Sequence, residues 1–172
     1  MKMNQRDSSK APLSPAAARV AALLQAADAA GPVVQLAQST RTAADAAAAI
    51  GCTVAQIAKS IVFRAASDRA VLVITSGANR VDEARVAAAL GEALGKADAT
   101  FVRAKTGYAI GGVCPIGHAE PPHVFIDASL ATLDPIWAAA GHPHAVFRTS
   151  FAELVSLTGG TVLAIGATHA SP

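Results

Sequence analysis

The sequence predicts a single α+β domain in which helices pack outside a mixed sheet. Apolar, β-branched stretches come in adjacent pairs joined by short polar turns, which is typical of hairpins. Helical patterns lie between these pairs without the regular strand–helix alternation of parallel α/β folds. The 172 residues suffice for one core, which must rest on Val, Leu and Ile because only 4% of the residues are aromatic.

Helices are expected wherever a capping residue precedes an apolar pattern. Ser14 before Pro15 is a good helix start, with serine as the N-cap and proline at the first helical position. Thr42, Thr53 and Ser150 each precede an acidic or amide residue three positions on, as in a capping box. Together with an amphipathic pattern after Asn79, these signals predict helices over residues 15–31, 42–51, 53–59, 81–91 and 150–160.

Strands are expected where β-branched and apolar residues run between turn signals. The stretch AVLVITS, residues 70–76, is apolar on both faces and predicts a central strand. It pairs as a hairpin with the preceding SIVFRAA through a turn at Ser67 and Asp68. Residues 128–141 predict a short helix or turns around a half-buried Trp137. The predicted strands are 33–37, 60–66, 70–76, 100–103, 108–110, 124–127, 145–150 and 161–166.

The ends of the chain predict solvated tails around one domain: a flexible segment at 1–12, the domain at 13–166 and a short tail at 167–172. The first residues lack the apolar core of a secretory signal, and no run is long enough for a membrane span. We therefore expect a cytoplasmic protein without a membrane partner. The net charge of +2 permits a phosphate-bearing partner without requiring one, and no helix shows the basic face of a DNA-recognition helix.

The stretch TGYAIGGVCPIGH, residues 106–118, offers the most chemistry. A nucleophile–base pair of Cys114 and His118 is one interpretation, but no neighbouring residue is placed to lower the pKa of the thiol. A buried loop thiol is the plainer one. A metal site built from histidines is another, although HPH, residues 142–144, lacks the spacing of two ligands on one helix face. No phosphate-loop motif is present.

Two other features suggest a site held by backbone groups and one cation. Gly111 and Gly112 can adopt conformations that turn backbone N–H groups toward an oxyanion, and Pro115 stiffens the far side of the loop. Lys59 lies between a predicted short helix and the apolar strand SIVF, where its ammonium group could anchor a phosphate or a carboxylate. A lysine that merely covers a strand edge would show the same pattern.

In this order, AKSIVF, VLVITSGANRVD, TGYAIGGVCPIGH, VFID and AGHPHAVFRTS resemble the YbaK/EbsC family over roughly residues 18–165. The family includes the editing insertion of bacterial prolyl-tRNA synthetases and its free-standing relatives. The resemblance implies a mostly antiparallel, barrel-like mixed sheet surrounded by helices. It also implies hydrolysis of the ester that links a wrong amino acid to tRNA, acting on the 3′ acceptor end without a metal or other cofactor.

By this resemblance, Lys59 matches the essential lysine of the family, and Gly111 and Pro115 match its GxxxP loop with Gly112 between them. Ser60 occupies the position after the lysine. The resemblance implies catalytic roles for Lys59 and Gly111. It implies substrate-binding roles for Ser60, Gly112, Cys114, Pro115, Gly141 and His142. Water, assisted by the terminal ribose hydroxyl of the tRNA, would attack the ester.

Two departures bear on the amino acid that is removed. Cys114 stands where cysteine-specific relatives commonly have serine, and GHPH, residues 141–144, replaces their basic segment. The chain is thus more similar to free-standing relatives that clear alanine, serine or threonine. The leading hypothesis is a deacylase acting in trans on tRNA that carries a small wrong amino acid such as Ala, Ser, Thr or Cys. An aminoacyl-tRNA synthetase is a possible partner. The alternative is a non-catalytic module that binds tRNA ends or a small ligand.

Overall fold

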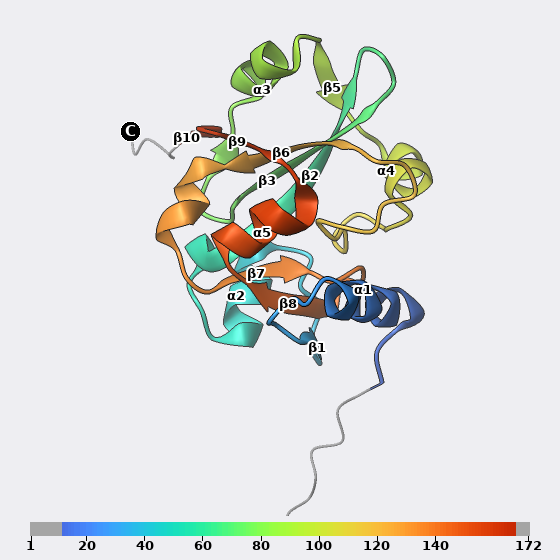
Figure 1. Cartoon of the computed structure of the whole chain (residues 1–172), viewed down its shortest axis with the longest axis vertical. Helices are drawn as coiled ribbons and strands as arrows, with labels where there is room; N and C mark the ends of the chain where they lie inside the picture. Colours follow the sequence, from blue (N-terminus) through green and yellow to red (C-terminus); the bar gives the residue numbers. More distant parts are fainter. Residues whose placement is uncertain (1–11, 168–172) are drawn as a thin grey trace, which may run out of the picture.

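The computed structural model describes residues 12–167, and Figure 1 shows a single α+β domain with one large mixed sheet. The helices are α1 (Pro15–Ala26), α2 (Ala43–Ile50), α3 (Glu83–Leu90), α4 (Ala99–Thr106) and α5 (Phe151–Thr158), with 3-10 turns η1 (Val54–Gln56) and η2 (Ala128–Thr132). The strands are β1 (Val33–Gln35), β2 (Ile57–Ala65), β3 (Ala70–Ser76), β4 (Arg80–Val81), β5 (Leu94–Lys96), β6 (His123–Asp127), β7 (Ile136–Ala139), β8 (Ala145–Thr149), β9 (Thr161–Leu163) and β10 (Gly166–Ala167). Apart from Pro12 and Ala167, the predicted tails lie outside the described residues.

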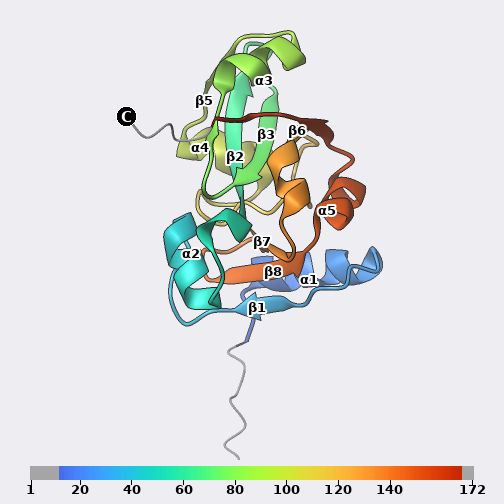
Figure 2. The same ribbon diagram turned by 90° about the vertical axis from the view of Figure 1, so that its left-hand side faces the viewer.

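The large sheet follows the order β1-β8-β7-β2-β3-β6-β9, and β5 also pairs with β2. Antiparallel pairs join β1 to β8, β7 to β8, and β2 to both β3 and β5, whereas β2–β7, β3–β6 and β6–β9 are parallel. The strands β1, β8 and β7 run across the direction of β2 and β3 (Figure 2). Within the described residues the order is an open path from β1 to β9, so the sheet bends without closing into a ring.

The predicted hairpin and its central strand are confirmed. β2 and β3 pair antiparallel across the turn at Ser67 and Asp68. β3 lies between β2 and β6, and all seven of its residues are buried. Burial on both faces explains the continuous apolar run in the sequence.

The predicted helix starts at Ser14, Thr42 and Ser150 are also confirmed, whereas the helix predicted from Val81 begins at Glu83 because Val81 belongs to β4. The side chain of Ser14 accepts a hydrogen bond from the N–H of Ala17, and the side chains of Thr42 and Ser150 cap α2 and α5 in the same way. α1, however, ends at Ala26 rather than near Gly31. At Gly31 the chain crosses β8, and a Cβ there would overlap the carbonyl oxygen of Arg148. This glycine therefore marks a close backbone approach and not a helix end.

The predicted strands at 100–103 and 108–110 are wrong, because residues 99–106 form α4 and residues 108–110 form a loop. The carboxylate of Asp98 accepts a hydrogen bond from the N–H of Phe101 at 2.8 Å and so caps the helix. The β-branched and aromatic residues at 100–102 suggested a strand, but the cap and the contacts of Phe101 outweigh this weak preference.

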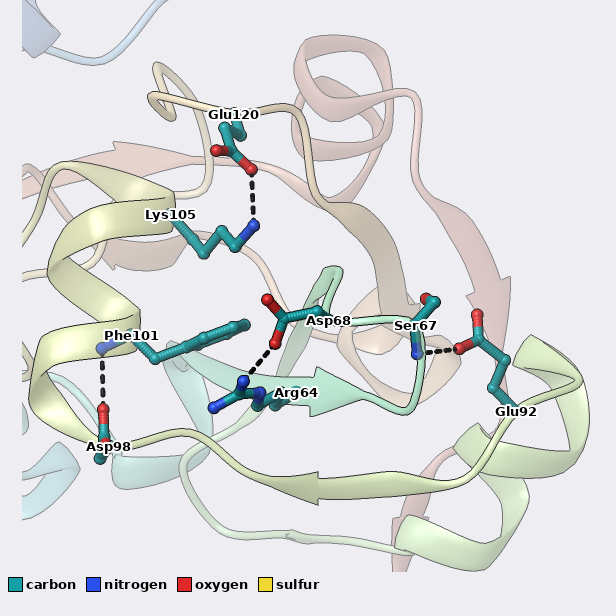
Figure 3. Close-up of polar contacts among 8 residues, drawn as sticks. All are labelled: Arg64, Ser67, Asp68, Glu92, Asp98, Phe101, Lys105 and Glu120. Atoms are coloured by element: carbon teal, nitrogen blue, oxygen red, sulfur yellow. Dashed lines mark hydrogen bonds and ion pairs between the residues drawn. The ribbon is translucent and has the colours of Figure 1, made fainter.

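The Phe101 ring fixes α4 against the β2–β3 hairpin (Figure 3). The guanidinium carbon of Arg64 lies 4.9 Å from the ring centroid and Nζ of Lys105 lies 5.8 Å from it, both within cation–π range. Arg64 also forms an ion pair with Asp68, and Lys105 one with Glu120 at 2.9 Å. Exposed ion pairs contribute little on their own, so the contact of Phe101 with Arg64 and the burial of Val102 in the core are the stronger attachments.

Three further differences concern where strands begin. The predicted helix over 53–59 is only the single turn η1, and β2 begins at Ile57. Lys59 therefore lies inside a strand and not at its start. Residues 128–141 contain β7 as well as η2, and the short strand β5 was not predicted. These strands are short or alanine-rich, so only their pairing partners define them.

A buried polar network joins the ends of β3 and β6. Asp127 is 1% exposed, and its carboxylate accepts hydrogen bonds from Thr75 Oγ1 at 2.7 Å, Asn79 Nδ2 at 3.2 Å and the Ser129 N–H at 3.1 Å. Burial by itself raises the pKa of this carboxyl, but these donors together bring the pKa below its ordinary value. Asp127 is thus an ionised structural anchor.

Candidate functional site

A cavity of about 610 Å³ lies along one edge of β2. Its walls come from four places: the first half of β2, the segment that leads into α2, the loop after α4, and strands β7 and β8. Most of the lining is apolar. The lining residues are Thr40, Arg41, Thr42, Ala43, Ala46, Ile57, Ala58, Lys59, Ser60, Ile61, Val62, Gly77, Ala97, Val102, Ile110, Gly111, Val113, Trp137, Ala138, Ala139 and Val146.

Lys59 contributes a positively charged side chain to this wall, and no acidic side chain among the described residues pairs with it. It pairs directly with Thr75 across β2 and β3. None of the ion pairs among residues 12–167 involves Lys59. Partial burial lowers the pKa of its ammonium group, and the positive charge of Arg80 lowers it further. Partial burial and the charge of Arg80 both disfavour the ammonium form of Lys59. An anion bound here would offset both effects, because it would pair with Lys59 and reduce the repulsion from Arg80.

The loop at residues 107–118, here called the glycine loop, reaches the same cavity through Gly111. Gly111 has φ of 91°, a conformation that other residues rarely adopt. The N–H of Gly112 is already engaged, since it donates to the carbonyl of Ala109 at 3.0 Å and closes a turn. The N–H groups of Gly111 and Val113 have no partner among the described residues. Gly111 and Val113 also line the cavity, so their N–H groups are candidate donors to a ligand.

Two side chains hold the rest of this loop in shape. The hydroxyl of Tyr108 donates to the carbonyl of Ile116 at 2.8 Å, and Arg19 from α1 donates to the carbonyl of Gly117 at 2.7 Å. Tyr108 is 1% exposed, and burial is the main reason that its pKa rises to about 12. The loop is therefore a rigid support for Gly111 and not a free surface loop.

Cys114 and His118 are in contact, but they do not form a nucleophile–base pair. The Nε2–H of His118 donates to the backbone carbonyl of Cys114 at 2.7 Å. Cys114 is fully buried, and burial raises the pKa of its thiol to about 12. Burial lowers the pKa of His118. At neutral pH the thiol stays protonated and the imidazole stays neutral, which gives no thiolate for nucleophilic attack.

The loop at 141–144 packs directly behind the glycine loop. A Cβ on Gly112 would lie 2.9 Å from the carbonyl carbon of His142. Thr40 ties the segment before α2 to this loop, because its backbone N–H and its hydroxyl both donate to the carbonyl of Pro143 at 2.6 Å. His142 Nδ1 accepts from the N–H of His144 at 3.1 Å. Three distant segments are thus joined around one wall of the cavity.

The structure brings Lys59, Ser60 and Gly111 together in the cavity wall. The other predicted site residues do not line it: Gly112, Cys114, Pro115, Gly141 and His142. Gly112, next to Gly111, packs closely against the backbone of His142, and this contact fixes the position of Gly111. Among residues 12–167, no three His, Cys, Asp or Glu side chains are grouped as a metal would require. None of the helices in that part of the chain is long and apolar enough to cross a membrane.

Sequence reasoning missed four residues at or near the cavity: Arg41, Arg80, Val113 and Trp137. Arg41 lies against Gly111, with its Cγ 3.3 Å from where a Cβ of that glycine would be. Trp137 is half-buried beside Ile57 and Ala46. Arg80 and Val113 lie within stretches that the sequence singled out, but their side chains carried no site signal there. Trp137 reaches the site through the pairing of β2 with β7, and Arg41 through the segment that leads into α2.

Comparisons with known proteins show what the chain is similar to. A family model described as "Aminoacyl-tRNA editing domain" matches residues 37–157. The "Uncharacterized protein YwhH" of Bacillus subtilis (strain 168) is 31% identical over 122 residues, which is 71% of this chain and 78% of that protein. A structure solved as "a putative trans-editing enzyme for prolyl tRNA synthetase" is 41% identical with a TM-score of 0.84, and the match covers 91% of this chain and 99% of the other. The "hypothetical protein APE2540" is 25% identical with a TM-score of 0.81, covering 87% and 99% of the two chains.

Proposed function

Because this chain belongs to the aminoacyl-tRNA editing domain family, as its resemblance to YbaK/EbsC proteins predicted, we propose that it deacylates mischarged aminoacyl-tRNA in trans. The observation that carries the proposal is the meeting of Lys59, Ser60 and Gly111 in one largely apolar cavity. Near-complete coverage of a solved structure described as a trans-editing enzyme supports action outside a synthetase. Such an enzyme works where tRNA is charged, which favours the cytoplasm.

The chemistry required of this site is modest because an aminoacyl ester is already activated. Water attacks the ester carbonyl, the bond between the carbonyl carbon and the ribose oxygen breaks, and the amino acid leaves while the tRNA regains its hydroxyl. The N–H groups of Gly111 and Val113, which lack partners among the described residues, would stabilise the developing oxyanion. Lys59 and Arg80 would hold the phosphate end of the terminal nucleotide.

The cavity lining favours a small, uncharged amino acid side chain. Ala58, Val62, Val102 and Val113 line it, and none of the described lining residues is acidic. A cationic side chain would be buried without a partner there, which is costly. We infer that the substrate carries an amino acid such as Ala, Ser, Thr or Cys. Editing of this kind is needed because a synthetase pocket discriminates only weakly against small or similar amino acids.

A panel of tRNAs, each mischarged with one small amino acid, tests the proposal. The wild-type protein should release at least one of the amino acids faster than spontaneous hydrolysis. Lys59→Ala should remove this acceleration and leave the circular dichroism spectrum and thermal midpoint unchanged. Lys105→Ala serves as the matched control, since Lys105 is paired with Glu120 and lies outside the cavity lining. Tight binding of tRNA without release of any amino acid would instead indicate a non-catalytic module.

A further inference from the structure

β2 has an unpaired stretch in the middle of one edge. On this edge β7 pairs with β2 only at Ile57 and Ala58, and β5 joins it only from Phe63 onward. Between these partners, residues 59–62 have no neighbouring strand among the described residues on this side. The same residues line the cavity, so the ligand space lies where a strand would otherwise pair.

The backbone groups exposed in this gap belong to Ser60 and Val62. The carbonyl of Ile57 accepts from the N–H of Gly77 at 2.6 Å, and the N–H of Ala65 donates to Arg69 at 2.9 Å, so odd-numbered residues of β2 bond toward β3. Since the bonding direction alternates along a strand, the N–H and C=O groups of Ser60 and Val62 point to the opposite, open edge. Buried backbone groups of this kind normally have partners.

The side chain of Ser60 adds a hydroxyl to these four backbone groups. Its Oγ is buried, and it has no hydrogen-bond partner among the described residues. Such an atom in a native site usually indicates a group or water that completes the structure when the site is filled. Besides its two N–H groups, the open edge therefore offers three acceptors on the wall of the cavity: two carbonyl oxygens and one hydroxyl.

This set of acceptors matches one part of an aminoacyl ester. Its α-amino group carries two or three N–H donors, and none of the described lining residues supplies a carboxylate for it. The ammonium group of Lys59 can only donate hydrogen bonds, so it suits an anionic group of the substrate and not the α-amino group. We propose that the open edge of β2, through the hydroxyl and carbonyl of Ser60 and the carbonyl of Val62, holds the α-amino group of the substrate. This assignment rests on the proposed function and makes Ser60 a positioning residue.

A pair of substrates that differ only at this group tests the assignment. One is a mischarged aminoacyl-tRNA, and the other is the same tRNA after nitrous acid has replaced the α-amino group with a hydroxyl. Each rate is divided by the spontaneous hydrolysis of the same ester. Loss of a charged hydrogen bond predicts a kcat/KM at least about tenfold lower for the hydroxyacyl substrate. Ser60→Ala should reduce kcat/KM for the aminoacyl substrate and change the hydroxyacyl value little, so the ratio of the two falls.

The controls separate this assignment from a general loss of structure. Ser60→Thr keeps the hydroxyl and should retain the discrimination between the substrates. Ser156→Ala, on the exposed face of α5, should change neither value. Equal acceleration of both esters by the wild type, or an equal loss on both in Ser60→Ala, would overturn the assignment while leaving the deacylase function in place. Acceleration of neither ester, by contrast, would contradict the deacylase function and the assignment with it.

Discussion

Gly112 lies so close to the backbone of His142 that a methyl group on it would come within 2.9 Å of the carbonyl carbon and 3.0 Å of Cα and N. Two loops far apart in sequence are thus locked together directly behind Gly111. Position 112 requires glycine because there is no room for a side chain, and not because of an unusual backbone angle. The atoms that a Cβ would overlap are backbone atoms of His142, which cannot rotate away. The position of the proposed oxyanion donors depends on this contact.

Gly112→Ala should therefore displace the glycine loop and lower deacylation. We expect a loss of about 1–3 kcal/mol in the free energy of unfolding, as is usual for overpacking, with a larger relative loss in kcat/KM. Urea unfolding and single-turnover deacylation measure the two effects. Gly95→Ala in β5 is the matched control, since its Cβ would meet only the Arg64 carbonyl at an ordinary 3.6 Å. Wild-type activity in Gly112→Ala would show that the loop position is unimportant.

The charge of Lys59 should set an alkaline limit to ligand binding. Burial and Arg80 lower its pKa, so the ammonium form is lost at a lower pH than for an ordinary lysine. Binding of a non-hydrolysable, amide-linked aminoacyl-adenosine 5′-phosphate should weaken as the pH rises through this lowered pKa. In Arg80→Ala the same decline should move to higher pH, because one repelling charge is gone. An affinity that stays flat as the pH rises from 7 to beyond the ordinary lysine pKa of about 10.4 would contradict the role of Lys59 as an anion anchor.

The buried carboxylate of Asp127 should make the fold sensitive to acid. Its pKa in the folded state lies below its ordinary value, so its contribution to stability is complete above the unfolded pKa, near 4, and is lost as pH falls through the folded pKa. Thr75→Val removes one donor and should cost about 1–3 kcal/mol at pH 7. The stability lost in Thr75→Val should become smaller as the pH falls from 4 to 2. Urea unfolding of both proteins at pH 7 and at these acid pH values measures the change. Thr132→Val, at an exposed turn, is the control.

Only one thiol should react readily in the folded protein. Cys114 is buried and its pKa is raised to about 12, whereas Cys52 is partly exposed. Ellman's reagent should therefore modify about one thiol per chain under native conditions and both in denaturant, because the thiolate is the reactive form. Cys114→Ala should keep deacylase activity if the loop retains its shape. Rapid native modification of Cys114, protected by aminoacyl-tRNA, would point back to a thiol in the site.

Local signals in the sequence predicted most helices and the central hairpin correctly. Ser14, Thr42 and Ser150 cap helices as expected, because a cap depends only on residues within one turn. The same logic could have found α4, since Asp98 precedes it as a cap, but the strand preference of Thr100 to Val102 obscured that signal. Strand β5 is defined by its pairing with β2, and β7 by its pairing with β2 and β8, which no local pattern reveals.

The sequence by itself determined the family, the fold class and the order of its motifs, including Lys59 and the glycine loop. Only the tertiary structure decided which residues share the cavity: it placed Cys114 in the core, engaged the N–H of Gly112 in a turn, and left the edge of β2 open at Ser60. The physical reason is that burial and hydrogen-bond partners are set by segments distant in sequence. The loop at 141–144 fixes the loop that carries Gly111, and β5 and β7 bound the open edge of β2, although β5 and β7 carry no motif of their own.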